Sequence, residues 1–190
     1  MKIMVETSAR HVHLTQEHLD ILFGKGYALT PKKDLSQPGQ FACVEKVEVV
    51  GPKGSLKMSI LGPVRPETQI EISKTETRTL GIDAPLRMSA DLEGTPGCKI
   101  IGPKGEITVD KGVIVAKRHA HFTPDDAKVF GVTDGQAIQI KLDYNGRSLI
   151  FGDVIARVSK TAGLAVHIDT DEANACALAT GDVVRMRQNA

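Results

Sequence analysis

Aromatic side chains are scarce in this 190-residue sequence: they make up 4% of the residues, and tryptophan is absent. A surface that stacks the bases of single-stranded nucleic acid needs such side chains, so this function is disfavoured. The formal net charge is only +1, and no field of the whole molecule therefore attracts DNA or anionic lipid. An anionic substrate would have to be captured by local arginine and lysine side chains.

Long apolar runs and a leader segment are also missing. No stretch of about 18 apolar residues is present that could cross a bilayer, and the N-terminal "MKIMVETSARHVH" lacks a signal-peptide pattern. The three cysteines, at positions 43, 98 and 176, form no Cys-x-x-Cys pair. That disfavours a disulfide framework and a zinc ribbon, so we expect reduced thiols in a cytoplasmic protein.

Two common signatures of catalysis are absent as well. The sequence has no Gly-x-Ser-x-Gly elbow, and no cysteine stands in a recognisable catalytic context. The Gly-Pro-Lys-Gly segments at 51–54 and 102–105 lack the P-loop spacing, and hairpin turns explain them better than phosphate cradles. An acyl-enzyme therefore has no obvious carrier, and acyl transfer would proceed by direct attack of a bound second substrate.

Glycine and proline divide the chain into many short apolar runs, which predicts a mainly β fold. "KVEVVGPKGSLKMSIL" (46–61) and "CKIIGPKGEITV" (98–109) each place a turn between two alternating segments, the pattern of a hairpin. Further strands are expected at 68–73, 112–121, 136–143, 153–158, 164–169 and 182–187.

Three short helices are predicted among these strands. One begins after the N-cap Thr15 and ends at Gly24, and another begins after Thr123 and ends at Gly131. The third is expected within 170–181, started by Asp169 or Thr170. Low-complexity segments are absent.

The order Arg-His-x-His-apolar-Thr occurs twice, in "TSARHVHLTQE" (7–17) and "VAKRHAHFTPDD" (115–126), 108 positions apart. Each copy leads into a predicted helix. We therefore expect two related β-barrel domains with short capping α-helices, residues 1–100 and 101–190, each with one histidine pair. The two Gly-Pro-Lys-Gly turns are not 108 positions apart, so the halves are no simple tandem copy, and a strand exchanged between them is one explanation.

Each His-x-His pair predicts a metal site. Residues i and i+2 of a strand point to the same face, so the two imidazoles of a pair lie side by side. Six histidines in this length give roughly 0.2 such pairs by chance. The alternative is a pair of surface or core histidines repeated by descent.

Two further candidate ligands lie on predicted strands. His167 stands in "LAVHIDT", and Glu71 in "TQIEIS" shares a face with Gln69 and Ser73. The candidate metal ligands are thus His11, His13, Glu71, His119, His121 and His167. One closed six-coordinate site would use them all, but three ligands on each of two ions fit this nitrogen-rich set better. Three protein ligands leave open positions, as at catalytic zinc.

Other residues near the first pair have simpler explanations. The series His11-x-His13-x₃-Glu17-x₆-Gly24 matches the spacing of a cupin iron site. A cupin would hold that glutamate on a strand, whereas Glu17 falls in the first turn of a capped helix and suits the helix dipole there. His18 is expected on the solvated surface of the same helix.

An anion receptor is predicted at Arg65, which stands between two prolines in "LGPVRPETQIEIS", six residues before Glu71. A guanidinium held on a stiff loop beside a metal donates two parallel hydrogen bonds to phosphate or carboxylate. An exposed surface arginine is the alternative for this stretch taken alone.

Four blocks, "SARHVHLT", "LGPVRPETQIEIS", "KRHAHFTPDDA" and "VHIDTDEANA", together resemble the propanediol-utilisation type of phosphotransacylase, the phosphate propanoyltransferase family. The resemblance runs over nearly the whole chain, in the right order. It implies a two-barrel fold with two zinc ions. Family members housed in bacterial microcompartments usually carry an N-terminal extension, and this chain begins just before the first block. We therefore expect an enzyme free in the cytoplasm, or a trimmed sequence.

The resemblance also implies roles for individual residues. It places His11, His13 and Glu71 on one zinc ion, and it makes Arg65 the phosphate-binding and catalytic arginine. The second zinc ion would be held by His119, His121 and His167. Ser8 and Asn174 match contacts to coenzyme A.

The expected activity is reversible transfer of a short acyl group, propanoyl or acetyl, between coenzyme A and inorganic phosphate by direct attack at a dinuclear zinc site. The expected partners are therefore coenzyme A or acyl-CoA and phosphate or acyl phosphate. The resemblance also implies a homodimer, which the family often forms. A dinuclear metallohydrolase acting on an ester or amide could have the same ligands. A non-catalytic metal-binding module would leave Arg65 without a purpose.

Overall fold

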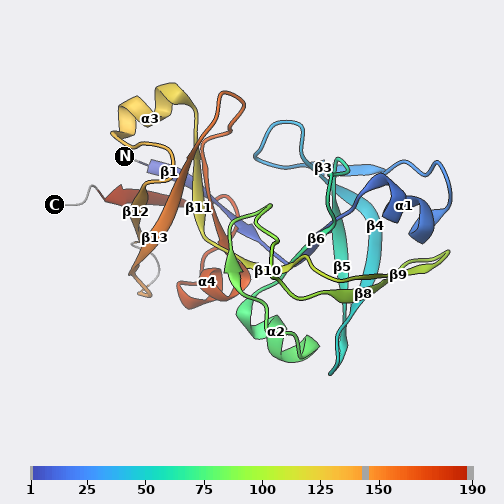
Figure 1. Ribbon diagram of the computed structural model, residues 1–190. Helices are drawn as coiled ribbons and strands as arrows, with labels where there is room; N and C mark the ends of the chain where they lie inside the picture. Colours follow the sequence, from blue (N-terminus) through green and yellow to red (C-terminus); the bar gives the residue numbers. More distant parts are fainter. Residues whose placement is uncertain (1, 143–145, 188–190) are drawn as a thin grey trace. The chain divides into compact units, whose positions relative to one another are not determined.

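The computed structural model describes residues 2–142 and 146–187, which form a mainly β fold (Figure 1). The chain divides into two compact units. Unit 1 contains the described residues within 1–8, 36–38 and 117–190, and unit 2 contains 9–35 and 39–116. The chain therefore changes unit at 8/9, 35/36, 38/39 and 116/117. No helix in the described ranges combines the length and apolar character that crossing a membrane requires.

Unit 1 is a closed barrel in which β1, at the N-terminus of the chain, joins strands from the C-terminal half. Figure 1 shows β1, in blue, among the orange and red strands. The strands follow one another around the barrel as β1 (Lys2–Ser8), β14 (Ala165–Asp169), β11 (His119–Phe122), β13 (Leu149–Val158), β12 (Ala137–Leu142) and β15 (Val183–Arg187). The prediction of a strand at 136–143 ends on residue 143, which lies outside the described residues.

The core of the barrel is built by the apolar residues that alternate along these strands. Phe122, Ile140 and Val154 are fully buried there, and Phe122 packs edge-on against Phe130 with ring centroids 5.5 Å apart. Burial of one face of every strand is what alternating patterns at 136–143 and 153–158 predict.

Two capped helices follow strands of unit 1. In α3 (Pro124–Phe130) the Thr123 side chain accepts from the backbone N–H of Asp126, as predicted. In α4 (Thr170–Ala175) the Asp169 carboxylate does the same for the third residue of the helix. The helix expected within 170–181 is confirmed with Asp169 as its N-cap, but it ends at Ala175, and Ala177 beyond it adopts a left-handed conformation (φ 55°).

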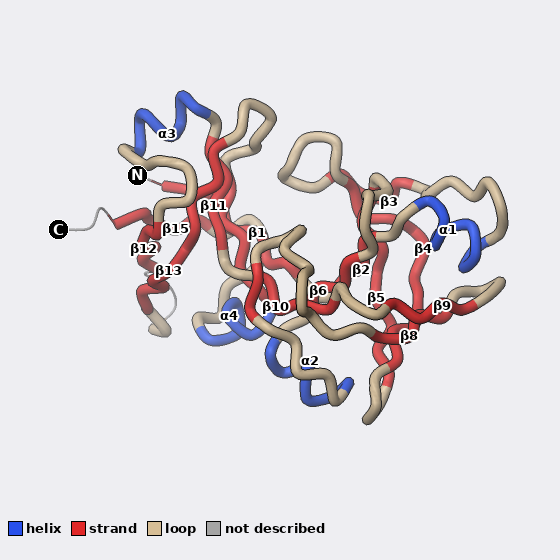
Figure 2. The backbone as a smooth tube through the Cα atoms, viewed as in Figure 1, coloured by secondary structure: helices blue, strands red, loops and turns tan. Residues whose placement is uncertain are grey.

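Unit 2 is a nine-stranded sheet. Its strands follow one another as β7 (Leu86–Arg87), β10 (Val113–Ala116), β6 (Gln69–Glu71), β2 (His11–His13), β5 (Ser55–Gly62), β4 (Phe41–Val50), β8 (Cys98–Ile101) and β9 (Glu106–Val109), with β3 (Pro31–Asp34) paired to β4. The sheet has end strands, β7 and β9, and so is not the closed barrel predicted for this half. Figure 2 shows how few helices accompany the strands.

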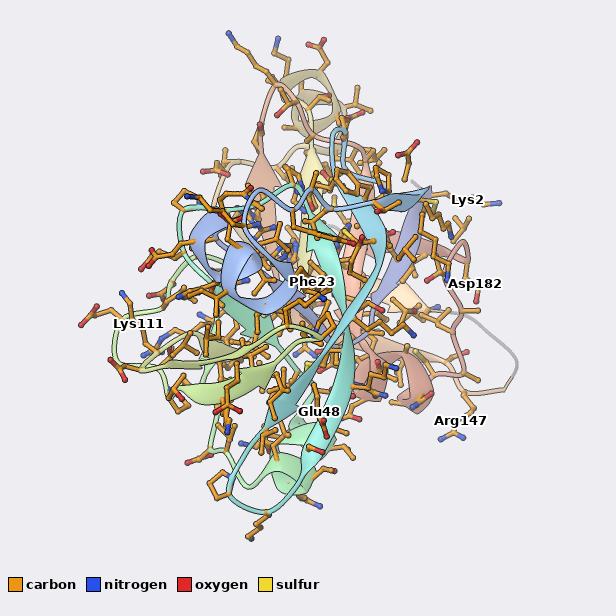
Figure 3. All side chains as sticks on the ribbon, turned by 90° about the vertical axis from the view of Figure 1, so that its right-hand side faces the viewer. Lys2, Phe23, Glu48, Lys111, Arg147 and Asp182 are labelled. Carbon is orange, nitrogen blue, oxygen red and sulfur yellow. The ribbon has the colours of Figure 1, made fainter. Side chains whose placement is uncertain are left out.

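Unit 2 contains α1 (Gln16–Phe23), which was predicted, and α2 (Lys74–Leu80), which was not. Phe23 ends α1 and packs with Tyr27 against the core of the unit (Figure 3). In α2, "KTETRTL" offers leucine as its only apolar side chain, so no apolar stripe announces a helix. The signal that could have found it is the capping box Ser73-x-x-Glu76 followed by glycine.

The two Gly-Pro-Lys-Gly segments are hairpin turns, as predicted. The N–H of the first glycine donates to the carbonyl of the last over 2.9 Å in both 51–54 and 102–105. The lysine N–H of each turn donates over 3.0 Å to the last turn of a helix, at the Leu80 carbonyl in one case and the Leu22 carbonyl in the other. These turns therefore cap helix ends and present no row of N–H groups to a phosphate.

The single strand predicted at 112–121 is wrong. The segment forms two strands, β10 in unit 2 and β11 in unit 1, separated by Lys117 and Arg118. Both strands are apolar enough to be buried, and the periodicity gave no sign of the break between them. The interruption matters because His119 and His121 consequently belong to the barrel, while the preceding valines belong to the sheet.

Two candidate metal centres

The first three-ligand group lies in unit 2, on the antiparallel strands β2 and β6. His11 stands directly opposite Glu71 in this register, and His13 projects beside His11 on the same strand. All three side chains are buried, and one ligand atom from each lies within 4.8 Å of the others. Pairing of the two strands therefore brings together residues that are 60 positions apart in the sequence.

Backbone carbonyls orient both imidazoles of this group. His11 Nδ1 lies 2.9 Å from the Ala9 carbonyl oxygen, and His13 Nδ1 lies 3.2 Å from that of Leu61. A carbonyl only accepts, so each Nδ1 carries the proton and each Nε2 presents a lone pair. His11 Nε2 is 3.5 Å from Glu71 Oε2, which leaves room for an ion between them.

Gln69 and Ser89, which the sequence did not single out, complete the surroundings of Glu71. The Gln69 amide donates to Glu71 Oε1 over 2.5 Å and to Ser89 Oγ over 2.9 Å, and its oxygen accepts from the N–H of Ala90. One carboxylate oxygen of Glu71 is thus held by the amide and the other faces His11. Strand alternation places Gln69 on the same face as Glu71, but only the structure shows the hydrogen bond between their side chains.

Arg65 lies close enough to this group for its charge to act on His13. Its backbone N–H donates to the Leu14 carbonyl over 2.8 Å, and its Nη1 donates to Ser89 Oγ over 3.2 Å. Burial lowers the pKa of His13 to about 2, with further contributions from the charges of His11 and Arg65. A neutral His13 is the form that binds a metal ion.

The second three-ligand group lies in unit 1, on the antiparallel strands β11 and β14. His119 stands directly opposite His167, and His121 projects beside His119. The three ring centroids are 4.8 to 5.0 Å apart. His119 Nδ1 lies 2.8 Å from the Lys117 carbonyl oxygen, so its Nε2 presents the lone pair. Burial lowers the pKa of His121 to about 3, with smaller contributions from its neighbours His119 and Arg157.

Glu6 and Ser36 contact His167, and neither was predicted as a site residue. Glu6 is paired with His167 across β1 and β14, and its Oε2 lies 3.2 Å from His167 Nε2. The Ser36 hydroxyl donates to the same carboxylate and lies 3.1 Å from Nε2. Because a carboxylate accepts, it favours the tautomer of His167 that carries the proton on Nε2. In unit 2 the residue paired with Glu71 on the parallel neighbouring strand is Ile114, so an apolar side chain occupies the position that Glu6 has beside His167 in unit 1.

The remaining predicted residues lie in less enclosed positions. Ser8 ends β1 opposite Asp169 and is half-buried, and Asn174 is exposed on α4. Glu17 is exposed in the first turn of the helix α1, whereas a cupin site would hold it on a strand. His18 is not simply solvated: it is half-buried, and its Nδ1 lies 2.7 Å from Thr68 Oγ1.

The donor sets fit a divalent ion of intermediate softness. Two imidazoles with a carboxylate, or three imidazoles, are sets that zinc accepts, and both leave coordination positions for a substrate. The Nε2 lone pairs of His11, His13 and His119 are oriented before any ion arrives, because backbone carbonyls accept from the opposite ring nitrogens. Each unit thus has the means to bind one ion with open positions.

Known proteins are similar to this chain over nearly its whole length. A family model described as phosphate propanoyltransferase matches residues 4–179. The phosphate propanoyltransferase of Thermotoga maritima is 54% identical over 96% of this chain and 87% of its own length. That of Clostridioides difficile is 52% identical over 99% and 90%, and that of Listeria monocytogenes is 48% identical over 94% and 84%. The chain therefore belongs to the phosphate propanoyltransferase family of enzymes.

Proposed function

We propose that the chain catalyses reversible transfer of a short acyl group, propanoyl or acetyl, between coenzyme A and inorganic phosphate. The observation that carries the proposal is Arg65, held beside the buried three-ligand group of unit 2 in a chain whose relatives are named phosphate propanoyltransferases. A guanidinium next to an open metal position offers phosphate both charge and directed hydrogen bonds.

The metal part of the proposal is two zinc ions per chain. His11, His13 and Glu71 would hold one ion, and His119, His121 and His167 the other. When bound, zinc would supply a soft Lewis acid that stabilises the sulfur of coenzyme A as a leaving thiolate. We propose that the two sites serve the same reaction, as a dinuclear zinc mechanism.

Arg65 binds and orients the attacking phosphate. Its backbone is fixed by Leu14 and its guanidinium by Ser89, so the fork that faces phosphate loses little freedom on binding. An oxygen of phosphate attacks the thioester carbonyl carbon, the carbon–sulfur bond breaks, and the sulfur leaves with the electron pair. Phosphate is already ionised at neutral pH, so no strong general base is required. Ser8 and Asn174 would contact coenzyme A.

The burial and raised pKa values of the cysteines also support direct attack by phosphate. All three are buried, and burial raises the pKa of Cys43 to about 11 and that of Cys98 to about 12. The pKa of Cys176 is raised for the same reason. A thiol becomes a nucleophile only as the thiolate, so these residues are poor carriers of an acyl group.

The test is the release of free thiol from propanoyl-CoA, followed with and without inorganic phosphate. The proposal predicts that release requires phosphate and that acyl phosphate accumulates in equal amount. Release at the same rate without phosphate would show a hydrolase instead, and metal binding without any turnover would show a binding module.

A further inference from the structure

An arginine precedes each His-x-His pair, and the proposed function uses neither of them. Arg118 stands before His119 on β11, and Arg10 stands before His11 on β2. Both side chains donate to a glutamate carboxylate and to a backbone carbonyl, each within its own unit.

In unit 1, Arg118 joins three elements of the barrel. Its Nη1 donates to Glu172 Oε1 on α4 over 2.8 Å, and its Nε donates to the Gly152 carbonyl on β13 over 2.8 Å. The guanidinium also lies over the ring of Phe151, 5.1 Å from the centroid. The ion pair is largely shielded from solvent, with 26% of the Arg118 side chain and 21% of the Glu172 side chain exposed.

In unit 2, Arg10 does the same. Its Nη1 donates to Glu76 Oε1 on α2 over 2.7 Å, and its Nε lies 3.2 Å from the Lys57 carbonyl oxygen on β5. Here the arginine is more exposed, at 43%, although Glu76 is buried. No aromatic ring lies under the Arg10 guanidinium among the described contacts.

Each glutamate in turn holds the end of the strand that carries the third ligand. Glu172 Oε2 accepts from the N–H of Asp169, two residues after His167. Glu76 Oε2 accepts from the N–H of Ser73, two residues after Glu71. In each unit the arginine thus contacts a glutamate, and the same carboxylate contacts the backbone at the end of the strand that carries the third ligand.

The two sets of contacts are not a consequence of equal spacing. The arginine and the glutamate are 66 positions apart in unit 2 and 54 positions apart in unit 1. In both units the strand with the histidine pair lies between a parallel and an antiparallel neighbour, and the third ligand comes from the antiparallel one. The arginine donates one hydrogen bond to a backbone carbonyl of the parallel strand. It donates another to the glutamate in the helix that follows the antiparallel strand.

We propose that Arg10 and Arg118 are positioning residues, each of which holds the three strands of its ligand group at the separation that a metal ion requires. The proposal rests on the proposed metal sites. It gives a purpose to the arginine in the repeated Arg-His-x-His pattern that neither substrate binding nor ligation supplies. Direct hydrogen-bond partners of metal ligands typically change metal affinity by roughly 10- to 100-fold when they are replaced. These arginines act through one further carboxylate and the strand backbone, so the lower end of that range applies.

The experiment measures metal affinity at one site at a time in the full chain. His13→Ala removes the site of unit 2, so that Arg118→Met, Arg118→Lys and Glu172→Gln can be compared at the site of unit 1. Methionine keeps the apolar stem of arginine, and lysine keeps the charge without the fork. Lys128→Met is the matched control, because it breaks an exposed ion pair on α3 in the same unit.

Zinc affinity is measured by competition with a chromophoric chelator, and cobalt(II) absorption reports the geometry of the ligands. We expect Arg118→Met to weaken zinc binding roughly 10-fold and to alter the cobalt spectrum, with Arg118→Lys in between. Lys128→Met should leave both unchanged. In the reciprocal His121→Ala background, Arg10→Met should have a smaller effect, since its pair is more exposed.

Thermal melting of the metal-free protein shows whether each variant still folds, so that a loss of zinc affinity can be distinguished from a loss of stability. If Arg118→Met does not fold, Glu172→Gln, which keeps the shape and removes the charge, carries the same test. A folded Arg118→Met with the affinity and cobalt spectrum of its parent would overturn the inference while the metal sites stand. Failure of the unsubstituted chain to bind zinc would overturn the metal sites and this inference with them.

Discussion

Replacement of Arg65 by alanine is the perturbation that bears most directly on how phosphate is bound. The Arg65 backbone N–H donates to the Leu14 carbonyl and its guanidinium donates to Ser89, so alanine keeps the backbone bond of the loop and removes only the phosphate receptor. A charge-assisted hydrogen bond contributes about 1.5–3 kcal/mol. The loss corresponds to a decrease of roughly ten- to over a hundredfold in kcat/KM for phosphate.

The assay is thiol release from propanoyl-CoA at phosphate concentrations well below KM. Arg65→Lys should recover part of the rate, because it restores the charge but not the two parallel donors. Arg78→Ala is the control: it removes the same charge from an exposed position at the end of α2 in the same unit. An unchanged rate for Arg65→Ala under these conditions, or an equal loss for Arg78→Ala, would refute the role.

Three further predictions concern the ligand groups and the thiols. Gln69→Ala removes the amide that holds Glu71 Oε1, so zinc affinity at the unit 2 site should fall roughly 10-fold or more by chelator competition, and unchanged affinity would contradict this. His13 and His121 remain neutral in the folded metal-free protein, whereas in the unfolded chain they gain protons below pH 6.5. The free energy of unfolding should therefore decrease as the pH falls from about 7 to 5, by at most about 1.4 kcal/mol per pH unit for each histidine, and a flat pH profile in denaturant melts would count against burial of these rings. Cys98 should not react with a thiol reagent at pH 8 until the protein is denatured, because burial raises its pKa to about 12.

Much of the site could be predicted from the sequence because its geometry is local to single strands. Side chains at i and i+2 share a face whatever sheet the strand joins, so the histidine pairs needed no tertiary knowledge. Placing Glu71 and His167 beside the histidine pairs requires the register between neighbouring strands. The alternation of apolar residues suggests this register but does not determine it. The structure supplies it by placing each opposite the first histidine of its pair.

What could not be predicted depends on contacts between distant segments. Glu6 and Ser36 meet His167 only because β1 and the residues around 36 belong to the same unit as β14. Gln69 becomes important through its amide contacts, which no sequence pattern specifies. The change of unit at 116/117 could not be predicted for a similar reason, because it falls inside an apolar run that continues through 113–116 and 119–122.

The central claim is that each unit holds one metal ion through three side chains that strand pairing brings together. Zinc content per chain, measured by elemental mass spectrometry on protein purified with ample zinc, tests it most directly. The unsubstituted chain should contain two ions, and the chains with His11→Ala or His119→Ala should each contain one. Equal content in all three proteins, or no bound zinc in any, would contradict the claim.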